Sequence, residues 1–372
     1  MNCIISRYMP GKTILFRSGH TLSRNRHIVS PFINTLSQDY LKSARDSSYN
    51  VNTSSRKLSA SSRSIISNKT RRSVTTTANT MKASLPSSLT CPPTRSLSKV
   101  EDCQFYGIDD FQAVPLLEKI PVSSSSFVLR FGLPDATKSL QLSTCSCMLA
   151  KATINNGEDE ENVVRPYTPI SVNTQIGTFD LLVKRYENGT LSKYMCDDVE
   201  VNSSKISFRQ IPFNIKLDAS EFVSSPMIVM LAGGTGITPM IQALHAILGS
   251  DDNDNNKGKS KVVLVYGSRD KDDILAQELL DQWSKDYPQQ LTVTHVLSDS
   301  KDDNDDNTYR KGFVTKSLLE EVITCPIENV SHVMVCGPPP MYEALCGPRT
   351  ETDVVRGVLA DMGFTAEQVY KF

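Results

Sequence analysis

The stretch that decides the fold reads LAGGTGITPM and occupies residues 231–240. It follows an apolar run at 227–231 and precedes a helical pattern at 241–248. A strand, a glycine turn and a helix in this order let the main chain approach a pyrophosphate, which the N–H groups and the dipole of the helix N-terminus favour. A tight strand-to-helix turn without a ligand has the same appearance, so the rest of the chain must decide between the two.

Two further motifs flank the glycine turn. RPYTPIS lies upstream at 165–171, and CGPPPM lies downstream at 336–341. In the first motif, Arg165 offers a planar donor fork suited to a pyrophosphate, and Tyr167 offers a flat ring that can pack on another ring. Thr168 and Ser171 offer hydroxyls for the heteroatoms of a ring edge. An edge strand that carries two prolines is the alternative interpretation of this segment.

The hydrophobic pattern divides the chain into two domains. Short strand-like runs separated by Gly, Pro and Asn predict an antiparallel β-barrel over 101–217, with strands at 127–131, 179–184, 199–201 and 206–208. A linker is expected at 218–225. An α/β domain with a parallel sheet is expected over 226–372, with strands at 227–231, 262–265, 291–296 and 333–335 and helices at 241–248, 274–283, 315–322 and 352–362.

The first hundred residues differ from the rest in charge and composition. They hold sixteen Lys and Arg against two acids, Asp39 and Asp46, together with 32 Ser and Thr. This basic, Ser-rich and acid-poor composition is typical of an organelle transit peptide, so residues 1–100 are predicted to be a disordered targeting leader. Arginines that recur early favour a mitochondrial address over a plastid one: Arg7, Arg17, Arg24 and Arg26. A disordered tail without an address is the alternative.

Composition argues against several other kinds of protein. The nine cysteines form no CxxC pair, so no metal site is expected and reduced thiols in an interior compartment are favoured. The basic residues of the leader are scattered, which argues against a nucleic-acid-binding arm. No apolar run is long enough to span a bilayer, although peripheral association with a membrane stays open. We expect a monomer.

The three motifs occur in one order and together resemble those of the ferredoxin reductase superfamily. RPYTPIS resembles its RxYTxxS flavin signature, and GGTGITPM and CGPPPM resemble its pyridine-nucleotide and nicotinamide segments. Within the superfamily the chain is most similar to the NADH–cytochrome b5 reductases, in particular the mitochondrial type of plants and algae. The runs FDLLVK at 179–184 and QVYKF at 368–372 support this narrower likeness, which covers roughly residues 105–372. It implies a flavoprotein with an FAD-binding barrel followed by an NAD(P)H-binding α/β domain.

The resemblance also implies a role for each matching residue. Arg165 would hold the FAD pyrophosphate, Tyr167 would lie against the isoalloxazine, and Thr168 would sit near its N5 edge. The other residues implied in FAD binding are Pro166, Leu182, Lys184, Tyr186, Gly189, Thr190, Leu191 and Ser192. The residues implied in NADH binding are Gly233, Gly234, Thr235, Gly236, Thr238, Asp273, Cys336, Gly337, Pro338 and Met341. Thr168 and Cys336 would be the catalytic pair beside the reacting rings, and no general base or covalent nucleophile is expected.

The implied activity is hydride transfer from NADH to FAD, followed by single-electron transfer to cytochrome b5 or a similar haem protein. Asp273 favours NADH because a carboxylate repels a 2′-phosphate, whereas the pair Ser268–Arg269 resembles that of NADPH-using relatives. Lys184, Arg185 and Lys193 are candidates for a basic patch that would meet an acidic partner. Two alternatives stay open: an NADPH-using reductase with an iron–sulphur or quinone acceptor, and a catalytically silent nucleotide-binding protein.

One departure from the family pattern is visible in the sequence. Relatives often have Gly-Gln-His upstream of the arginine motif, where this chain has Cys145-Ser146-Cys147. A proton-relay or docking role of that position is therefore not implied for this chain.

Overall fold

The structure, a computed structural model, describes residues 85–107, 110–155, 160–210, 219–223, 225–249, 260–299 and 308–372. Contacts between Cα atoms place all of these in one unit, Ser55–Phe372. Most of the expected leader, residues 1–84, lies outside the described ranges. Within them, no helix is both long and apolar enough to cross a bilayer.

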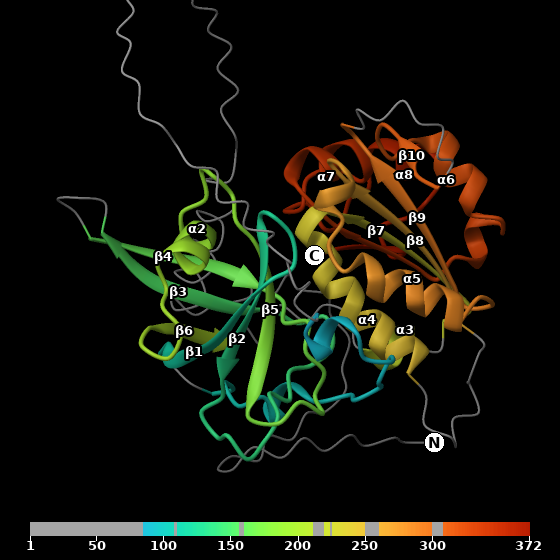
Figure 1. Cartoon of the computed structure of the whole chain (residues 1–372). Coiled ribbons are helices and arrows are strands. Elements are labelled where there is room, and N and C mark those ends of the chain that lie inside the picture. Colours follow the sequence, from blue (N-terminus) through green and yellow to red (C-terminus); the bar gives the residue numbers. More distant parts are fainter. Residues whose placement is uncertain are drawn as a thin grey trace, which may run out of the picture. The chain divides into compact units, whose positions relative to one another are not determined.

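The first domain is one six-stranded antiparallel sheet (Figure 1). Its strand order is β4-β3-β6-β1-β2-β5, so β4 and β5 form the two edges. The strands are β1 (Gln112–Pro121), β2 (Ser126–Gly132), β3 (Met148–Asn155), β4 (Glu160–Tyr167), β5 (Thr178–Lys184) and β6 (Lys205–Gln210). A short helix, α2 (Leu191–Asp197), contacts β3, β4 and β5 and therefore joins the two edges of the curled sheet. The predicted antiparallel FAD-binding fold is confirmed.

Aromatic packing fills the interior of this sheet. Phe105, Phe131, Phe179 and Phe208 are almost fully buried, and their ring centroids lie 4.9–6.4 Å apart. Three of these come from strands whose alternate residues face one side, as a sheet with one buried face requires. The strand expected at 199–201 is wrong: these residues lie in a turn region that follows α2, where Asn202 has a positive φ. A residue in the left-handed backbone conformation interrupts the extended geometry that strand pairing requires.

The second domain is a six-stranded parallel sheet with the order β10-β9-β8-β7-β11-β12 (Figure 1). Its strands are β7 (Met227–Gly233), β8 (Lys261–Ser268), β9 (Leu291–Leu297), β10 (Arg310–Lys311), β11 (His332–Cys336) and β12 (Val369–Lys371). Its helices are α3 (Ala219–Phe222), α4 (Ile237–Leu248), α5 (Gln277–Asp286), α6 (Lys316–Val322), α7 (Pro339–Leu345) and α8 (Gly357–Asp361). The predicted parallel α/β domain is confirmed.

Several boundaries differ from the expected ones. The helix expected at 352–362 is limited to α8, because Gly357 has φ +61° and Arg356 is extended. The expected linker contains α3. Strand β12 was not expected, and it pairs in parallel with β11.

The expected leader boundary at residue 100 lies too far along the chain. Residues 85–100 are described, and Leu89 is 2% exposed within a core cluster that also holds α4 side chains. The composition of residues 1–100 did not indicate that 85–100 belong to the fold, because few apolar residues anchor this segment. This same core cluster contains Val128 and Leu182 of the antiparallel sheet, so one apolar core runs across both domains.

Candidate functional site

The arginine motif forms the end of edge strand β4. Arg165, Pro166 and Tyr167 are its last residues, and Thr168 follows directly; all four are half-buried. Hydrogen bonds to Asp180 on β5 fix the segment that comes next, since the N–H of Ile170 donates to the Asp180 carbonyl over 2.9 Å. The motif therefore spans from one edge of the sheet to the other.

Tyr167 presents an uncharged aromatic surface in this motif. Its ring packs against the core of the antiparallel domain. Burial raises the pKa of the Tyr167 phenol; Cys196 and Tyr186 raise it slightly further, and the positive charge of Arg165 acts in the opposite direction. The phenol stays protonated at neutral pH, so the ring can serve as a flat packing surface, as the sequence predicts.

The other edge supplies the second group of predicted flavin residues. Leu182 and Lys184 lie on β5, Tyr186 follows the strand, and Gly189-Thr190-Leu191-Ser192 forms the turn into α2. A Cβ on Gly189 would collide with the Ser192 hydroxyl and would lie 3.0 Å from Tyr186 Cβ. Only glycine fits this close approach, which draws backbone N–H groups and the Ser192 hydroxyl together beside β4 and β5. This donor set suits a phosphate, so the residues present fit FAD.

The glycine turn lies at the carboxyl edge of the parallel sheet, next to the third motif. Cys336 at the end of β11 is in register with Ala232 at the end of β7. Gly234–Gly236 forms a 3-10 turn (η4), and the Thr238 hydroxyl of α4 donates to the Thr235 carbonyl over 3.1 Å. From β7 the chain proceeds to β8 on one side, while β11 lies on the other. Ligands of open α/β sheets bind at such a switch point.

Close packing interlocks these two motifs. A Cβ on Gly236 would collide with the Cys336 carbonyl, and a Cβ on Gly233 would lie 2.7 Å from Met341 Sδ and 2.9 Å from Pro338 Cδ. A Cβ on Gly337 would likewise lie 2.5 Å from Met341 Sδ. The glycines of both motifs are thus required by each other, and the predicted coenzyme residues form one continuous wall.

Three side-chain contacts join the coenzyme half to the flavin half. Gln242 Nε2 of α4 donates to the Pro169 carbonyl over 2.6 Å, and the Cys145 thiol donates to the Pro239 carbonyl over 3.4 Å. Lys184 Nζ lies 2.7 Å from Asp273 Oδ1. The motifs that the sequence separates by many residues therefore meet at one place.

The Lys184–Asp273 ion pair connects two predicted residues that the sequence assigned to different cofactors. The Lys184 side chain is 15% exposed and that of Asp273 is 6% exposed. Asp273 lies in the 3-10 turn η5 (Lys271–Asp273), and its other oxygen lies 3.1 Å from Arg269 Nε. Arg269 also pairs with Asp270 over 3.3 Å. Its charge is therefore already balanced by two carboxylates, which disfavours a role in binding a 2′-phosphate.

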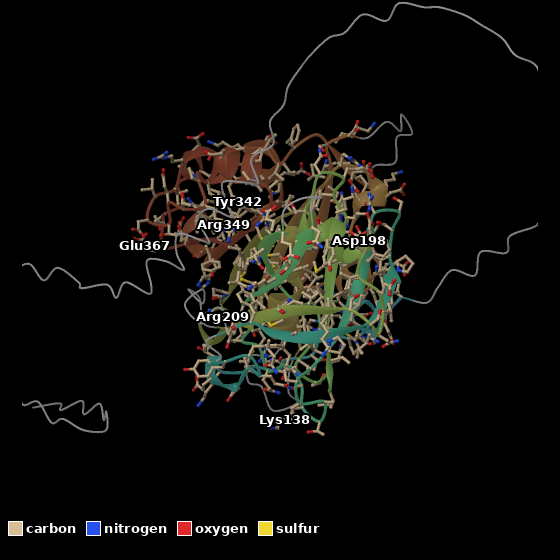
Figure 2. All side chains as sticks on the ribbon, turned by 90° about the vertical axis from the view of Figure 1, so that its left-hand side faces the viewer. Lys138, Asp198, Arg209, Tyr342, Arg349 and Glu367 are labelled. Atoms are coloured by element: carbon tan, nitrogen blue, oxygen red, sulfur yellow. The ribbon has the colours of Figure 1, made fainter. Side chains whose placement is uncertain are left out.

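Cys336 is a neutral thiol in the site. Burial raises the pKa of Cys336 to about 12, with the hydroxyl of Tyr342 acting in the opposite direction. Figure 2 shows Tyr342 in the α/β domain, where its hydroxyl has two main-chain oxygens within reach of its single hydrogen, that of Phe372 at 2.8 Å and that of Val335 at 3.2 Å. A thiol with a raised pKa is a poor nucleophile, which agrees with a wall residue rather than a covalent one.

Comparison with known proteins gives the same division of the chain. Residues 113–209 match the oxidoreductase FAD-binding domain, and residues 230–347 match the oxidoreductase NAD-binding domain. NADH-cytochrome b5 reductase 1 of Debaryomyces hansenii is 39% identical over 241 residues, which cover 64% of this chain and 77% of that protein. NADH-cytochrome b5 reductase 2 of Scheffersomyces stipitis is 33% identical over 273 residues, 72% of this chain and 85% of that protein.

The chain belongs to the NADH–cytochrome b5 reductase family.

A solved structure supports this assignment. The cytochrome b5 reductase domain of Ulva prolifera nitrate reductase superposes with a TM-score of 0.59 at 27% identity, covering 72% of this chain and 99% of that one. The fold resemblance of the reductase family thus extends over both domains.

The basic patch expected for an acidic partner is not free in this reductase. Arg185 Nε lies 2.7 Å from Asp197, and its guanidinium also pairs with Glu187 over 3.5 Å. Lys184 is held by Asp273. Of the three candidates, Lys193 is exposed, and its positive charge helps to lower the pKa of the Asp197 carboxyl. The sequence missed this because two of the compensating acids, Asp197 and Asp273, come from α2 and from the α/β domain.

Sequence reasoning also missed residues that support the site. Asp180 is fully buried and binds the Arg130 guanidinium through both carboxylate oxygens, at 2.8 and 2.9 Å. Tyr266 is buried under the glycine turn, and its hydroxyl donates to the Gly234 carbonyl over 3.0 Å. Gln242 gives no sequence signal beyond its place on a helix. The Asp180 carboxylate could have been found as a charged residue within the apolar run 179–183 of a predicted strand.

Proposed function

We propose that this chain is a flavoprotein that transfers a hydride from NADH to FAD and passes electrons singly to cytochrome b5 or a similar haem protein. The observation that carries the proposal is the meeting of three motifs from two domains. The Gln242–Pro169 hydrogen bond and the Lys184–Asp273 ion pair span that junction, and the glycines of the second and third motifs interlock. Family membership supports the same conclusion.

FAD, when bound, supplies the chemistry that accepts a hydride and releases single electrons. The chain's own residues bind FAD and NADH and orient them relative to each other. Arg165 and the turn at Gly189–Ser192 would be the donors for the FAD phosphates, and Tyr167 would be the flat surface for its ring system. Thr168 and Cys336 would lie beside the reacting rings. Holding two reactants in contact accounts for a large part of such a rate enhancement, and no acid–base residue is required.

The coenzyme half is built for a nucleotide without a 2′-phosphate. The Asp273 carboxylate is nearly buried close to the carboxyl end of β8, where it holds both Lys184 and Arg269. Arg269, the cation that could receive a 2′-phosphate, is also paired with Asp270. We therefore expect NADH rather than NADPH to be the electron donor.

Anaerobic reduction of the purified chain tests this proposal. NADH should bleach the oxidised-flavin absorbance rapidly, and NADPH should do so much more slowly. Addition of oxidised cytochrome b5 should then restore the flavin band, whereas ferredoxin should not. A protein that stays colourless after incubation with FAD would remove the basis of the proposal, and re-oxidation by ferredoxin alone would favour the iron–sulphur alternative.

We also propose that the basic N-terminal segment directs the protein to mitochondria and that the reductase is a monomer. The early arginines and the scarcity of acids support the address. A fusion of residues 1–100 to a fluorescent protein should co-localise with a mitochondrial dye, and accumulation in plastids would replace this assignment. Light scattering during gel filtration should give the mass of one chain, and flotation with liposomes tests peripheral membrane association.

A further inference from the structure

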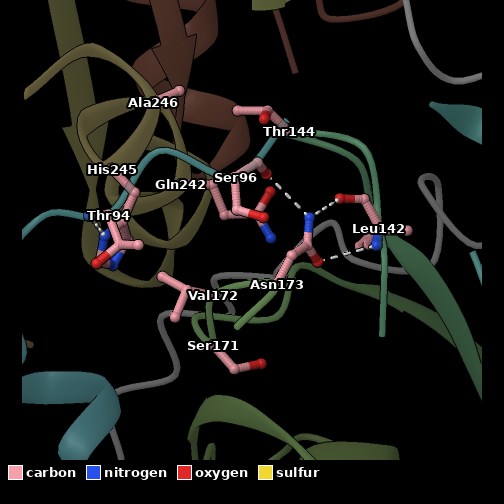
Figure 3. A pocket seen from close by; sticks show the side chains of 10 residues that line it. All are labelled: Thr94, Ser96, Leu142, Thr144, Ser171, Val172, Asn173, Gln242, His245 and Ala246. Atoms are coloured by element: carbon pink, nitrogen blue, oxygen red, sulfur yellow. Dashed lines mark hydrogen bonds between the residues drawn. The ribbon is translucent and has the colours of Figure 1, made fainter. Parts of the chain in front are cut away.

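The segment Ser87–Phe105, here called the clasp segment, touches both domains although it lies outside both matched family domains. It precedes β1 in the chain and contains two 3-10 turns, η1 (Ser87–Leu89) and η2 (Val100–Asp102). Figure 3 shows Thr94 and Ser96 of this segment beside side chains of α4 and of loops from the antiparallel domain. It makes specific hydrogen bonds on each side, and Leu89 and Phe105 also pack in the apolar cores.

On the α/β side, the clasp segment caps the C-terminus of α4. Arg95 Nε donates to the Ala246 carbonyl over 2.6 Å, and Arg95 Nη2 donates to the Ile247 carbonyl over 3.2 Å. The Thr94 N–H donates to His245 Nδ1 over 3.0 Å (Figure 3). The last carbonyls of a helix lack partners within the helix and carry partial negative charge. A guanidinium satisfies both needs at once.

The same side is held by two further contacts. Trp283 Nε1 of α5 donates to the Cys91 carbonyl over 3.0 Å. Gly249, which ends α4, lies so close to the segment that an added Cβ would collide with the Arg95 N atom. This glycine has an ordinary φ of −67°, so closeness to the clasp segment and to the helix's own carbonyls, rather than backbone conformation, requires it.

On the flavin side, the clasp segment binds the residues directly behind the arginine motif. The Ser88 hydroxyl donates to Asp180 Oδ2 over 2.7 Å, and both residues are buried. Asn173 Nδ2 donates to the Ser96 carbonyl over 3.1 Å (Figure 3). It also donates to the Ser98 hydroxyl over 2.9 Å. Asp180 in turn anchors the residues that follow Tyr167 through its backbone hydrogen bonds.

The end of the clasp segment is part of the antiparallel domain's core. Cys103 and Phe105 are 4% and 1% exposed there, and Gln210 Nε2 donates to the Val100 carbonyl over 3.1 Å. The cavity where the clasp segment, α4 and the two loops meet measures only about 30 Å³. A space of this size holds about one water molecule, so these elements pack against one another and do not frame a ligand site.

We propose that the clasp segment sets the position of the flavin-binding half against the coenzyme-binding half, with Arg95 as its positioning residue. The inference rests on the proposed hydride transfer. Helix α4 carries the coenzyme turn at its start and is held by Arg95 at its end, while Asp180 and Asn173 adjoin the flavin motif. A displacement of one half by about 1 Å can lower a transfer rate by orders of magnitude.

The test compares the full chain with Arg95→Ala, using Arg310→Ala as the control. Arg310 is an exposed arginine on β10 whose partner is Glu321, far from α4 in the sheet order. In Arg95→Ala we expect unchanged FAD content, an unchanged half-saturating NADH concentration, and a limiting rate of flavin bleaching that falls about tenfold. The long-wavelength charge-transfer absorbance of the flavin–nicotinamide pair should weaken as well. Arg310→Ala should match the unmodified chain.

Hydrogen exchange provides a readout that does not depend on activity. In Arg95→Ala the amides at the end of α4 and those at residues 169–173 should both exchange faster, because one clasp holds both. Asn173→Ala breaks the opposite end of the clasp and should give the same pair of changes if Arg95→Ala does not fold. Faster exchange confined to the mutated side would overturn the proposal, as would an unchanged bleaching rate in a folded, FAD-loaded Arg95→Ala chain. Failure of the unmodified chain to be bleached by NADH would instead reject the proposed function.

Discussion

The two ends of helix α4 are held in opposite ways. At its start, the glycine turn is fixed by close approach of backbone to backbone, and Gly236 leaves no room for a side chain beside the Cys336 carbonyl. At its end, the helix is fixed by polar side chains and N–H groups from residues about 150 positions away in the chain, Thr94 and Arg95. The start depends on glycines alone, whereas the end, besides the close approach at Gly249, depends on the particular side chain of Arg95. The contacts at the start of α4 can therefore be predicted from a short sequence motif, and those at its end cannot.

The largest effect is expected where a side chain is added at the start of α4. In Gly236→Ala the new methyl group would collide with the Cys336 carbonyl, and the turn and the CGPPPM segment would have to separate. We expect the rate of flavin reduction by NADH to fall about a hundredfold or more, because the ring contact depends on this wall. Stopped-flow absorbance measures the rate.

Gly267→Ala is the matched control for this variant. Gly267 lies on β8 next to the same turn, and an added Cβ would meet only the Ala232 carbonyl at 3.7 Å, an ordinary contact. Its rate should stay close to that of the unmodified chain. Equal losses of rate in both variants would show that any added methyl group in this region slows flavin reduction. The close approach of Gly236 to Cys336 would then not explain the effect.

The second effect concerns the ion pair that joins the two domains beside the start of α4. Asp273→Asn removes the carboxylate that pairs with the nearly buried Lys184 ammonium and should lower the free energy of unfolding by about 3 kcal/mol. Lys184→Met should lower it by less, because Asp273 keeps its ion pair with Arg269. The double variant should lose less than the sum, with a coupling energy of about 1–3 kcal/mol. Chemical denaturation of the four proteins measures this cycle. If the two single losses of unfolding free energy add exactly in the double variant, the Lys184–Asp273 contact does not couple the two domains energetically.

A third, smaller effect is expected from the residue that fastens the end of the chain to the coenzyme wall. Tyr342→Phe removes the hydroxyl, whose one hydrogen reaches the Phe372 main-chain oxygen at 2.8 Å and the Val335 oxygen at 3.2 Å, and leaves the aromatic ring in place. The loss of stability should be about 1–2 kcal/mol, the usual range for buried acceptors left without a donor. Thermal unfolding measures it. No change in the melting temperature would mean that the hydroxyl contributes nothing to the attachment of β12.

Much of the fold and the wall of the site could be predicted from the sequence because local patterns specify them. The run of apolar residues, the glycines and Pro239 place β7, η4 and α4 almost as observed, and β11 extends the strand expected at 333–335 by one residue at each end. Register then requires the two motifs to meet, since Ala232 and Cys336 pair directly. Such features depend on neighbours in sequence or on adjacent parallel strands.

The remainder depends on contacts between distant segments, which one sequence does not reveal. Residues 85–100 have the composition of a leader, and only the tertiary partners of Ser88, Thr94 and Arg95 show that they belong to the fold. Lys184 looked like a basic docking residue because its partner Asp273 lies in another domain. The strand expected at 199–201 failed for a local reason, since the chain turns there and Asn202 has a positive φ. Composition and periodicity describe a segment but not its neighbours.

The smallest effect probes the far end of α4 through pH. Burial lowers the pKa of His245 to about 4, below its ordinary 6.5, and the ring accepts a hydrogen bond from the Thr94 N–H as a neutral group. The unfolded chain therefore binds more protons between these two values than the folded chain does. Stability from His245 is complete above about pH 6.5 and declines as the pH falls towards 4. Chemical denaturation at several pH values should show this decline, and His245→Asn, whose amide oxygen can accept the same N–H, should flatten it. If both proteins respond equally to pH, another group controls acid sensitivity, and the end of α4 is held by Arg95 without help from the imidazole.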